Sequence, residues 1–414
     1  MRRIAIVGAG QAGLQLALGL QDADYDVTLL SDRSARQIRE GAVTSTQLMF
    51  GPALALERAA GLNLWDEQAP VMAGVEMNQW DPAAHTPRRA RFTASYDDEV
   101  RSVDQRLKLS AWLELFEARG GRVQYGAVAP DEMPGIVARH DLTVVATGRG
   151  ALSVLFGRDG TRSVYDGPQR AVAVFYATGV TGRGEDSDAY LRATGVPSVG
   201  DAIALQALTV GGPCDILLIE GRFGGPYDCW ADRPSPHEGL RRAVELLRVY
   251  APWEYERFTS AEPTDGQAAL YGGVTPAVRH GVAALGEGQY VLGMADAVVV
   301  HDPLTGQGAN NAARAAAGYL EAILKRGDLP YDEQWMRRTF EDYWQHARHV
   351  HAFTDLMLRQ PQAEHVGRLL GATFEYPEVA HRFVNGYADP ASYRDWLMDP
   401  ERADAYLARL TGSR

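Results

Sequence analysis

The chain has 414 residues, of which 46% are hydrophobic and 23% charged, a balance typical of a folded globular protein with two or three domains. Its formal net charge is −12, and basic residues are scattered among acidic ones, so we expect no nucleic-acid partner. The two cysteines, Cys214 and Cys229, lack metal-ligand or disulfide spacing, which predicts no metal site and favours a reducing, cytoplasmic location.

The sequence predicts no membrane segment and no secretion signal. Glycines and Gln11 interrupt the apolar stretch that follows Met1-Arg2-Arg3, and no small-residue cleavage site comes after it. No other stretch is long and apolar enough to span a bilayer.

The N-terminal residues predict the opening β-α-β unit of a doubly wound sheet. Residues 3–7 are typical of a short buried strand, 8–13 of a turn, 14–20 of a helix and 27–30 of a second strand. The turn reads Gly-Ala-Gly-Gln-Ala-Gly. Placed between a strand and a helix, this spacing predicts a dinucleotide site.

Each glycine of this turn has an expected role. Gly8 permits the tight turn, Gly10 lets the backbone approach a pyrophosphate, and Gly13 allows the helix to pack closely on the strand. The helix N-terminus offers oriented N–H groups to the anion.

An acidic residue is expected near the end of the second strand, where it would accept a hydrogen bond from a ribose hydroxyl. The candidate is Asp32, followed by Arg33. Ser31 occupies the position where the acid commonly stands, so a solvated loop role for Asp32 stays open.

Further elements follow in chain order. The expected helices and strands are a helix at 106–119, a strand running into a glycine turn at 140–148, strands at 171–176 and 216–220, a helix near 239–250, a strand at 290–293, a long helix at 307–325 and several helices after 329. The region from about 168 to 285 is rich in strands, which predicts a mostly β substrate domain.

A second glycine-containing turn precedes the long helix at 307–325. Gly306 and Gly308 free the backbone to approach a flat ring, and the helix start offers N–H groups to the electron-rich edge of a reduced flavin. Asp296 is placed to accept from a ribityl hydroxyl. Taken alone, the stretch also fits an ordinary helix entry with an aspartate cap.

Four motifs in this order and spacing resemble the FAD-binding motifs of the styrene and indole monooxygenases. They are the glycine turn 8–13, Val-Asp-Gln-Arg-Leu at 103–107, Val-Val-Ala-Thr-Gly at 144–148, and the stretch from 293 to 310. The resemblance implies a Rossmann-like FAD-binding domain of the glutathione-reductase and p-hydroxybenzoate-hydroxylase type, with a β-rich substrate domain and a C-terminal helical region. The implied domains are 1–75, 98–165 and 286–328 for FAD, 76–97 and 166–285 for substrate, and 329–414 for the helices.

The resemblance also implies the oxygenase half of a two-component system. A separate NADH-dependent reductase supplies reduced FAD, which with O₂ forms a C4a-(hydro)peroxide that epoxidises an electron-rich aromatic alkene such as indole or styrene. A homodimer stays open. The implied cofactor-binding residues are Gly8, Gly10, Gln11, Ala12, Gly13, Asp32, Arg33, Arg106, Asp296, Pro303, Gly306, Gly308, Ala309 and Asn310.

The segment 41–50 bears on the substrate. If it is extended, Ser45, Gln47 and Met49 face one side. This Ser-x-Gln-x-Met pattern resembles the indole-oxidising branch, so we expect indole to be preferred over styrene. Ala42-Val43 stands where an arginine is common in the family, and a buried strand that only packs on the flavin domain is an equal alternative.

No side chain is predicted to be a catalytic acid or base, since the sequence has no convincing Ser-His-Asp set or paired carboxylates. His301 is expected to be structural. The alternatives are a flavin-dependent halogenase, whose Trp-x-Trp-x-Ile segment is absent, a single-component NAD(P)H-dependent hydroxylase, and a non-catalytic FAD carrier. No second glycine-rich fingerprint for a nicotinamide dinucleotide follows a strand, which favours the two-component hypothesis.

Overall fold

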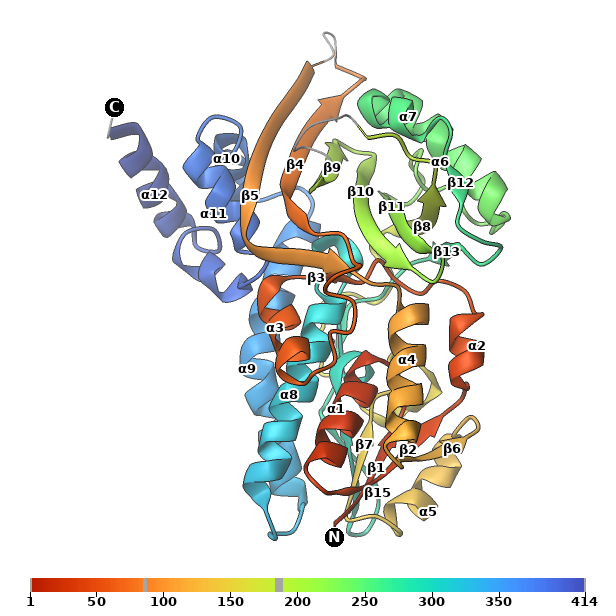
Figure 1. The fold of residues 1–414 in the computed structure, drawn as a ribbon. Helices are drawn as coiled ribbons and strands as arrows, with labels where there is room; N and C mark the ends of the chain where they lie inside the picture. Colours follow the sequence, from red (N-terminus) through yellow and green to blue (C-terminus); the bar gives the residue numbers. More distant parts are fainter. Residues whose placement is uncertain (1, 85–87, 183–188, 413–414) are drawn as a thin grey trace.

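The structure is a computed structural model that describes residues 2–84, 88–182 and 189–412. Its described strands form two large sheets, one in the lower and one in the upper half of Figure 1, with the C-terminal helices along one side. A short two-stranded pairing, β14 (Ala277–Val278) with β17 (Val299–Val300), lies apart from both sheets. Residues 85–87 and 183–188 of the predicted substrate domain lie outside the described part.

The first sheet is the predicted doubly wound sheet. Its strands, in the order β15-β16-β7-β1-β2-β6, are β15 (Val282–Gly286), β16 (Gln289–Gly293), β7 (Leu142–Val145), β1 (Arg3–Val7), β2 (Asp26–Ser31) and β6 (Arg122–Tyr125). β1 pairs in parallel with β2 and β7. Residues 4–7 of β1 are buried on both faces, as an apolar run at the centre of a parallel sheet should be.

Helices cover this sheet. On the side seen in Figure 1, α1 (Gln11–Asp22) packs between α4 (Gln105–Ala118) and α8 (Gly308–Arg326). The other helices of this half are α2 (Ala35–Arg39), α3 (Gly51–Ala59) and α5 (Met133–Val137). The predicted helices at 14–20, 106–119 and 307–325 are therefore confirmed within a few residues.

The second sheet contains nine of the described strands and is mostly antiparallel. They are β3 (Leu48–Met49), β4 (Met72–Asp81), β5 (Arg88–Ser102), β8 (Ala171–Thr178), β9 (Tyr190–Val196), β10 (Gly200–Thr209), β11 (Gly212–Gly221), β12 (Glu262–Pro263) and β13 (Ala269–Gly272). The predicted domain borders at 75/76, 97/98 and 285/286 fall inside β4, β5 and β15.

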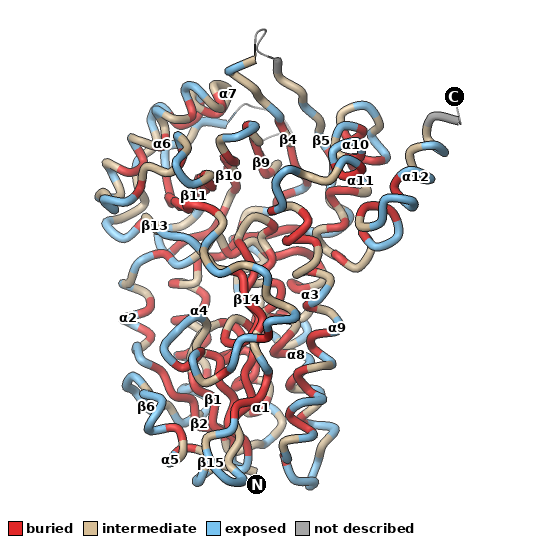
Figure 2. The backbone as a smooth tube through the Cα atoms, turned by 180° about the vertical axis from the view of Figure 1, so that it is seen from behind, coloured by how far each residue is buried: buried red, intermediate tan, exposed pale blue. Residues whose placement is uncertain are grey.

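Different helices pack on the two faces of the second sheet. α6 (Pro236–Tyr250) and α7 (Pro252–Phe258) pack on the face that carries Phe175 and Leu217. The opposite face carries Val174 and Leu218, and the C-terminal helices pack against its cluster. Those helices are α9 (Glu333–Leu358), α10 (Glu364–Ala372), α11 (Pro377–Asn385) and α12 (Pro400–Gly412). Figure 2 shows buried backbone in both halves, and the buried apolar side chains form separate clusters, one around the first sheet and two on the faces of the second.

Candidate active site

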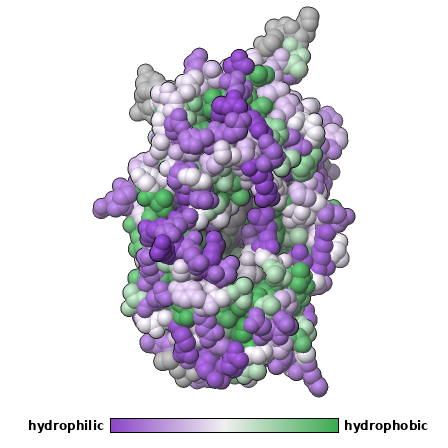
Figure 3. Space-filling model, turned by 90° about the vertical axis from the view of Figure 1, so that its right-hand side faces the viewer, coloured by the Kyte–Doolittle hydropathy of each residue, from purple (hydrophilic) through white to green (hydrophobic). Residues whose placement is uncertain are grey.

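A cavity of about 580 Å³ lies between the two sheets. It is bordered by the loops after β1, β2 and β7, by the segment 44–48, and by side chains of β8, β11 and β13. This position, outside the carboxyl ends of parallel strands, is where doubly wound sheets bind ligands. The face drawn in Figure 3 is hollowed at mid-height, with hydrophilic side chains around the hollow. The volume is within the range of small-molecule and cofactor pockets.

The glycine turn after β1 forms one end of this cavity. Gly8 has φ +115°, and an added Cβ there would meet the Ala146 carbonyl oxygen at 2.5 Å. At Gly13 an added Cβ would be 2.0 Å from the Gly8 carbonyl oxygen. At Gly10, by contrast, nothing described comes nearer than 3.9 Å. Gly8 and Gly13 thus serve packing, whereas Gly10 leaves open space toward the cavity, and Gly13 itself does not line it.

Asp32 and Arg33 line the cavity beyond the end of β2. Their side chains are 3.7 Å apart at the closest charged atoms and both are largely exposed. Ser31 is buried, and its hydroxyl donates to the Arg33 carbonyl oxygen at 2.6 Å. The hydroxyl at the usual acid position is therefore used within the loop, and Asp32 is the carboxylate that lines the cavity at this strand end.

The loop before α8 forms the opposite wall. Pro303, Gly306, Gly308 and Ala309 line the cavity, and an added Cβ at Gly308 would meet nothing described within 4 Å. Gly306 has φ +63°, a backbone conformation that favours glycine.

Asn310, which was also expected at the cofactor, lies one layer behind the cavity instead. Its amide nitrogen donates to the carbonyl oxygens of Leu48 and Gly306, each at 2.9 Å, and its oxygen accepts from the Phe50 N–H at 2.8 Å. These bonds occupy its amide, so Asn310 holds the two cavity-lining loops together rather than facing the cavity.

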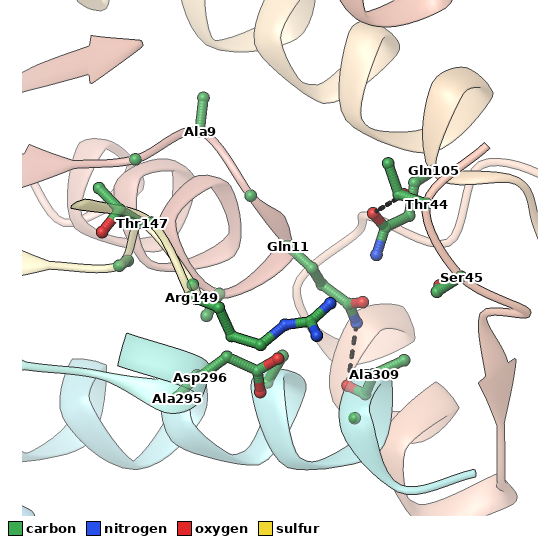
Figure 4. Close-up of a pocket in the computed structure, with 18 of the residues that line it drawn as sticks. Ala9, Gln11, Thr44, Ser45, Gln105, Thr147, Arg149, Ala295, Asp296 and Ala309 are labelled. Atoms are coloured by element: carbon green, nitrogen blue, oxygen red, sulfur yellow. Dashed lines mark hydrogen bonds between the residues drawn. The ribbon is translucent and has the colours of Figure 1, made fainter. Parts of the chain in front are cut away.

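Asp296 and Arg149 both line the cavity, and the Arg149 side chain extends toward Asp296 (Figure 4). Burial raises the pKa of the Asp296 carboxyl to about 6, and the Arg149 guanidinium partly opposes this shift. Arg149 follows the strand β7 and its glycine turn, at a position where sequence analysis assigned no role. The pair supplies a hydrogen-bond acceptor and a cation to the same part of the cavity.

The segment 44–48 lines the cavity, but the expected alternation of Ser45, Gln47 and Met49 on one side is wrong. Gln47 has φ +49°, so the backbone turns there and the segment is not continuously extended. Met49 is buried away from the cavity, with its sulfur 3.1 Å from the Lys108 Nζ atom. Ser45 and Gln47 stay together, because the Gln47 side-chain nitrogen donates to the Ser45 hydroxyl at 3.3 Å.

Arg106 does not reach the cavity either. Its guanidinium is 3% exposed and forms ion pairs with Asp104 at 2.8 Å and Asp265 at 3.0 Å. It also donates to the Thr209 hydroxyl at 3.1 Å. The side chain therefore joins the start of α4 to β10 and to the loop after β12, and its neighbour Gln105 lines the cavity in its place.

Gln11 joins the glycine turn to a buried ion pair. Its side-chain nitrogen donates to Glu57 at 3.1 Å and to the Ala309 carbonyl oxygen at 3.2 Å (Figure 4). Glu57 is fully buried and accepts from Lys108 at 2.8 Å. This cluster fixes α1, α3, α4 and α8 relative to one another directly behind the cavity.

Sequence reasoning missed the apolar wall of the cavity. Val172 and Val174 of β8, Leu218 of β11 and Leu270 of β13 form it. Successive side chains of β8 and β11 point to opposite faces of the sheet, one at the cavity and one under α6. Because both faces are apolar, the sequence pattern does not distinguish them. His301 also lines the cavity, and burial lowers its pKa to about 3, so the imidazole is neutral at physiological pH.

The residues at the cavity fit a flavin dinucleotide. Gly10 and Gly308 leave space for close approach to the backbone at its two walls. Several buried polar atoms at the lining have no hydrogen-bond partner within the described part of the chain: Gln11 Oε1, Gln47 Oε1, Thr147 Oγ1, His301 Nδ1 and Asp302 Oδ2. A polar ligand with several donors and acceptors would pair with such atoms.

Two further findings concern the described residues. No group of three or more His, Cys, Asp or Glu side chains among them is arranged to hold a metal ion. None of the helices between residues 2 and 412 has an apolar stretch that could cross a bilayer.

Comparison with known proteins decides the family. The chain is 30% identical to the styrene monooxygenase StyA of Pseudomonas sp over 422 aligned positions, which cover 99% of this chain and 98% of the relative. The chain belongs to the styrene monooxygenase StyA family. Residues 148–257 also match the family model described as the styrene monooxygenase A putative substrate binding domain. This stretch contains the apolar strands β8 and β11 of the cavity wall.

Solved structures confirm the predicted fold class. The flavin-dependent brominase Bmp2 is 12% identical with a TM-score of 0.66, and the alignment covers 100% of both chains. PqsL, a probable FAD-dependent monooxygenase from Pseudomonas aeruginosa, is 15% identical with a TM-score of 0.62, covering 95% of this chain and 98% of that one. At these identities the likeness concerns the fold alone.

Proposed function

We propose that the protein is the oxygenase component of a two-component flavin monooxygenase. It takes reduced FAD from a separate NADH-dependent reductase, uses O₂, and epoxidises an electron-rich aromatic alkene, with indole preferred over styrene. The observation that carries this proposal is the single cavity in which the dinucleotide turn of the first sheet meets the apolar wall of the second. Membership of the styrene monooxygenase StyA family supports it.

The cavity residues would divide the work of holding FAD. Gly10 and the N-terminus of α1 would bind the diphosphate, because the backbone there is open and its N–H groups point outward from the helix start. Asp32 would accept from a ribose hydroxyl, and Asp296 from a ribityl hydroxyl. The backbone at Gly306 and Gly308 would lie against the isoalloxazine ring. Bound in its reduced form, FAD supplies the electrons and the reactivity toward O₂.

The apolar wall would hold the substrate and exclude water. Val172, Val174, Leu218 and Leu270 offer no hydrogen-bonding side-chain atoms, so an aromatic hydrocarbon is favoured there over a polar molecule. Exclusion of water matters because loss of reduced oxygen as hydrogen peroxide competes with transfer to the substrate.

Gln47 supports indole over styrene. Its Oε1 atom is buried without a partner among the described residues, while its nitrogen is used by Ser45. Indole has one N–H group that can donate to such an oxygen, and styrene has none. A buried acceptor left unpaired costs free energy, so the substrate that satisfies it should bind better.

The first experiment tests the reaction without the reductase. Anaerobically reduced FAD is mixed with the protein and with indole or styrene in parallel, air is admitted, and products are compared with a sample lacking protein. More oxygenated indole than in the sample without protein supports the proposal. If styrene oxide forms in preference to oxygenated indole, the proposed reaction stands but the proposed substrate preference is wrong. If both substrates yield only hydrogen peroxide and oxidised FAD, the epoxidase proposal fails.

A second experiment tests Gln47. In Gln47→Met the side chain keeps its length and loses its acceptor, so kcat/KM for indole should fall roughly tenfold. Styrene epoxidation in the same variant is the matched control and should change by less than about twofold, since styrene forms no hydrogen bond there. Equal losses with both substrates would show that Gln47 does not recognise the N–H group.

A third experiment tests the need for a separate reductase. The purified protein with FAD and indole should not consume NADH, and adding a flavin reductase should start the reaction. Rapid NADH oxidation by the protein alone would identify a single-component hydroxylase instead.

A further inference from the structure

Arg149 is a cation of the cavity lining without a partner in the described part of the chain. Its guanidinium takes part in none of the ion pairs or hydrogen bonds among residues 2–84, 88–182 and 189–412. Arg33, the other arginine among the described lining residues, lies 3.7 Å from the Asp32 carboxylate. The charge of Arg149 is therefore available to a ligand, whereas that of Arg33 is already opposed.

The first sheet places the loop of Arg149 beside the glycine turn. Its strand β7 lies between β1 and β16. Where β7 ends, the Ala146 N–H donates to the Val7 carbonyl oxygen at 2.8 Å, and the Met294 N–H donates to the Val145 carbonyl oxygen at 2.9 Å. The loop that carries Arg149 therefore leaves the sheet between the glycine turn after β1 and the segment after β16.

Two glycines flank Arg149. Gly148 has φ +62°, so the chain turns sharply after β7, and Gly150 follows Arg149 directly. Arg149 is exposed, and Figure 4 shows its side chain extending toward Asp296. Residues 9–11 of the glycine turn line the same cavity. A ligand that lies along this lining can contact the guanidinium, and no ion pair of the described residues has to break.

The diphosphate of FAD needs a cation in this cavity. The chain has a formal net charge of −12, and the described lining includes the carboxyl groups of Asp32, Asp296 and Asp302. Such surroundings repel a negative ligand unless a positive group offsets them. Arginine suits this role, because its planar guanidinium can donate two parallel hydrogen bonds to phosphate oxygens.

We propose that Arg149 binds the diphosphate of FAD and so makes the cavity select a flavin dinucleotide over riboflavin, which has the same ring but no phosphate. This inference rests on the proposed function, in which Gly10 and the N-terminus of α1 hold the diphosphate. Arg149 adds a side-chain cation to those backbone groups. The ring of reduced flavin also carries negative charge. The diphosphate is the better match, since the loop of Arg149 begins with a hydrogen bond to the strand that leads into the glycine turn.

Binding of two ligands tests this proposal without turnover. We would titrate wild type, Arg149→Gln, Arg149→Lys and Arg139→Gln with oxidised FAD and with riboflavin, and follow the flavin fluorescence. Arg139 is the matched control, because it is an exposed arginine just after α5 and does not line the cavity.

The expected losses differ between the ligands. In Arg149→Gln the Kd for FAD should rise roughly 10- to 100-fold, the effect of losing a hydrogen bond to a charged group, while the Kd for riboflavin stays within about twofold. Arg149→Lys should give an intermediate Kd for FAD, because it keeps the charge and loses the paired donors. Arg139→Gln should bind both ligands as wild type does.

Salt provides a second readout, which a merely structural role of Arg149 would not change. Salt screens charge pairs, so the wild-type Kd for FAD should rise as sodium chloride is added, while the Kd for riboflavin stays nearly constant. In Arg149→Gln the rise for FAD should be smaller. The wild-type measurement stands alone if Arg149→Gln does not fold, and an FAD affinity that is independent of salt would overturn the proposal.

The remaining outcomes separate this proposal from the proposed function. Wild-type FAD affinity in Arg149→Gln overturns the proposal alone, and so does an equal loss of FAD and riboflavin. A loss seen only with reduced FAD, titrated anaerobically, would assign Arg149 to the flavin ring and also overturn it. If wild type binds neither FAD nor riboflavin, the proposed function fails, and this inference fails with it.

Discussion

Gly10 and Gly13 belong to one turn, but their replacement by alanine should have different effects. In Gly13→Ala the new methyl would stand 2.0 Å from the Gly8 carbonyl oxygen, so the helix or the turn must move. We expect the free energy of unfolding to fall by roughly 1–3 kcal/mol, the usual effect of overpacking. In Gly10→Ala nothing described is nearer than 3.9 Å, and the backbone at φ −79° and ψ 179° accepts alanine.

For Gly10→Ala the loss should appear in FAD binding. Alanine reduces the conformational freedom of the unfolded chain, which stabilises the fold, but it is a poorer helix cap than glycine, which destabilises it. Because the two effects oppose each other, the free energy of unfolding should change by less than about 1 kcal/mol. The methyl would occupy the space through which a diphosphate oxygen approaches the backbone N–H groups. Loss of one hydrogen bond to a charged group corresponds to about 1.5–3 kcal/mol, or roughly a 10- to 100-fold higher Kd for FAD.

The assay combines urea unfolding of the ligand-free protein with fluorescence titration by oxidised FAD. Gly318→Ala is the control, because Gly318 is an exposed glycine of α8 with open space around it and does not line the cavity. It should bind FAD as wild type does and be equally or more stable. Wild-type FAD affinity in Gly10→Ala would refute the placement of the diphosphate at this turn.

Three other substitutions test the groups behind and within the cavity. Lys108→Met leaves the fully buried Glu57 without its ammonium partner and should lower the free energy of unfolding by roughly 3–5 kcal/mol in urea titrations. Adding Glu57→Gln to this variant should recover part of the lost stability. No recovery would argue against a paired charge. Arg106→Gln should lower the free energy of unfolding by a similar amount, while the Kd of the folded protein for FAD stays within about threefold of wild type. A higher Kd at unchanged stability would instead support the predicted contact between Arg106 and the cofactor. Ionisation of Asp296 is disfavoured in the fold, so stability of the ligand-free protein should decline from pH 3.8 to about 6, and less steeply in Asp296→Asn; parallel curves would refute the raised pKa.

The sequence predicted best those parts of the site whose geometry is set by residues adjacent in the chain. The strand, turn and helix around Gly8, Gly10 and Gly13 are local, and their spacing alone predicted the open backbone at Gly10. The loop at Gly306 and Gly308 is local in the same way. Both of these stretches of the cavity lining could therefore be predicted.

Prediction failed where a side chain depends on residues far away in the sequence. Arg106 is held by Asp265, 159 positions later, and no pattern around Arg106 shows that its charge is already used. Gln47 adopts a positive φ although its neighbours suggest an extended strand, because tertiary contacts override a local preference.

These failures follow one rule about motifs. A motif identifies residues that a cofactor site requires, but it does not say which of them touch the ligand. Gly13, Arg106 and Asn310 all lie in motifs, and each acts behind the cavity on the packing or the position of a lining loop. Because such residues act through the fold, their loss should alter stability or loop position first and ligand contacts only second. Measuring the free energy of unfolding beside the FAD affinity therefore separates the two kinds of motif residue.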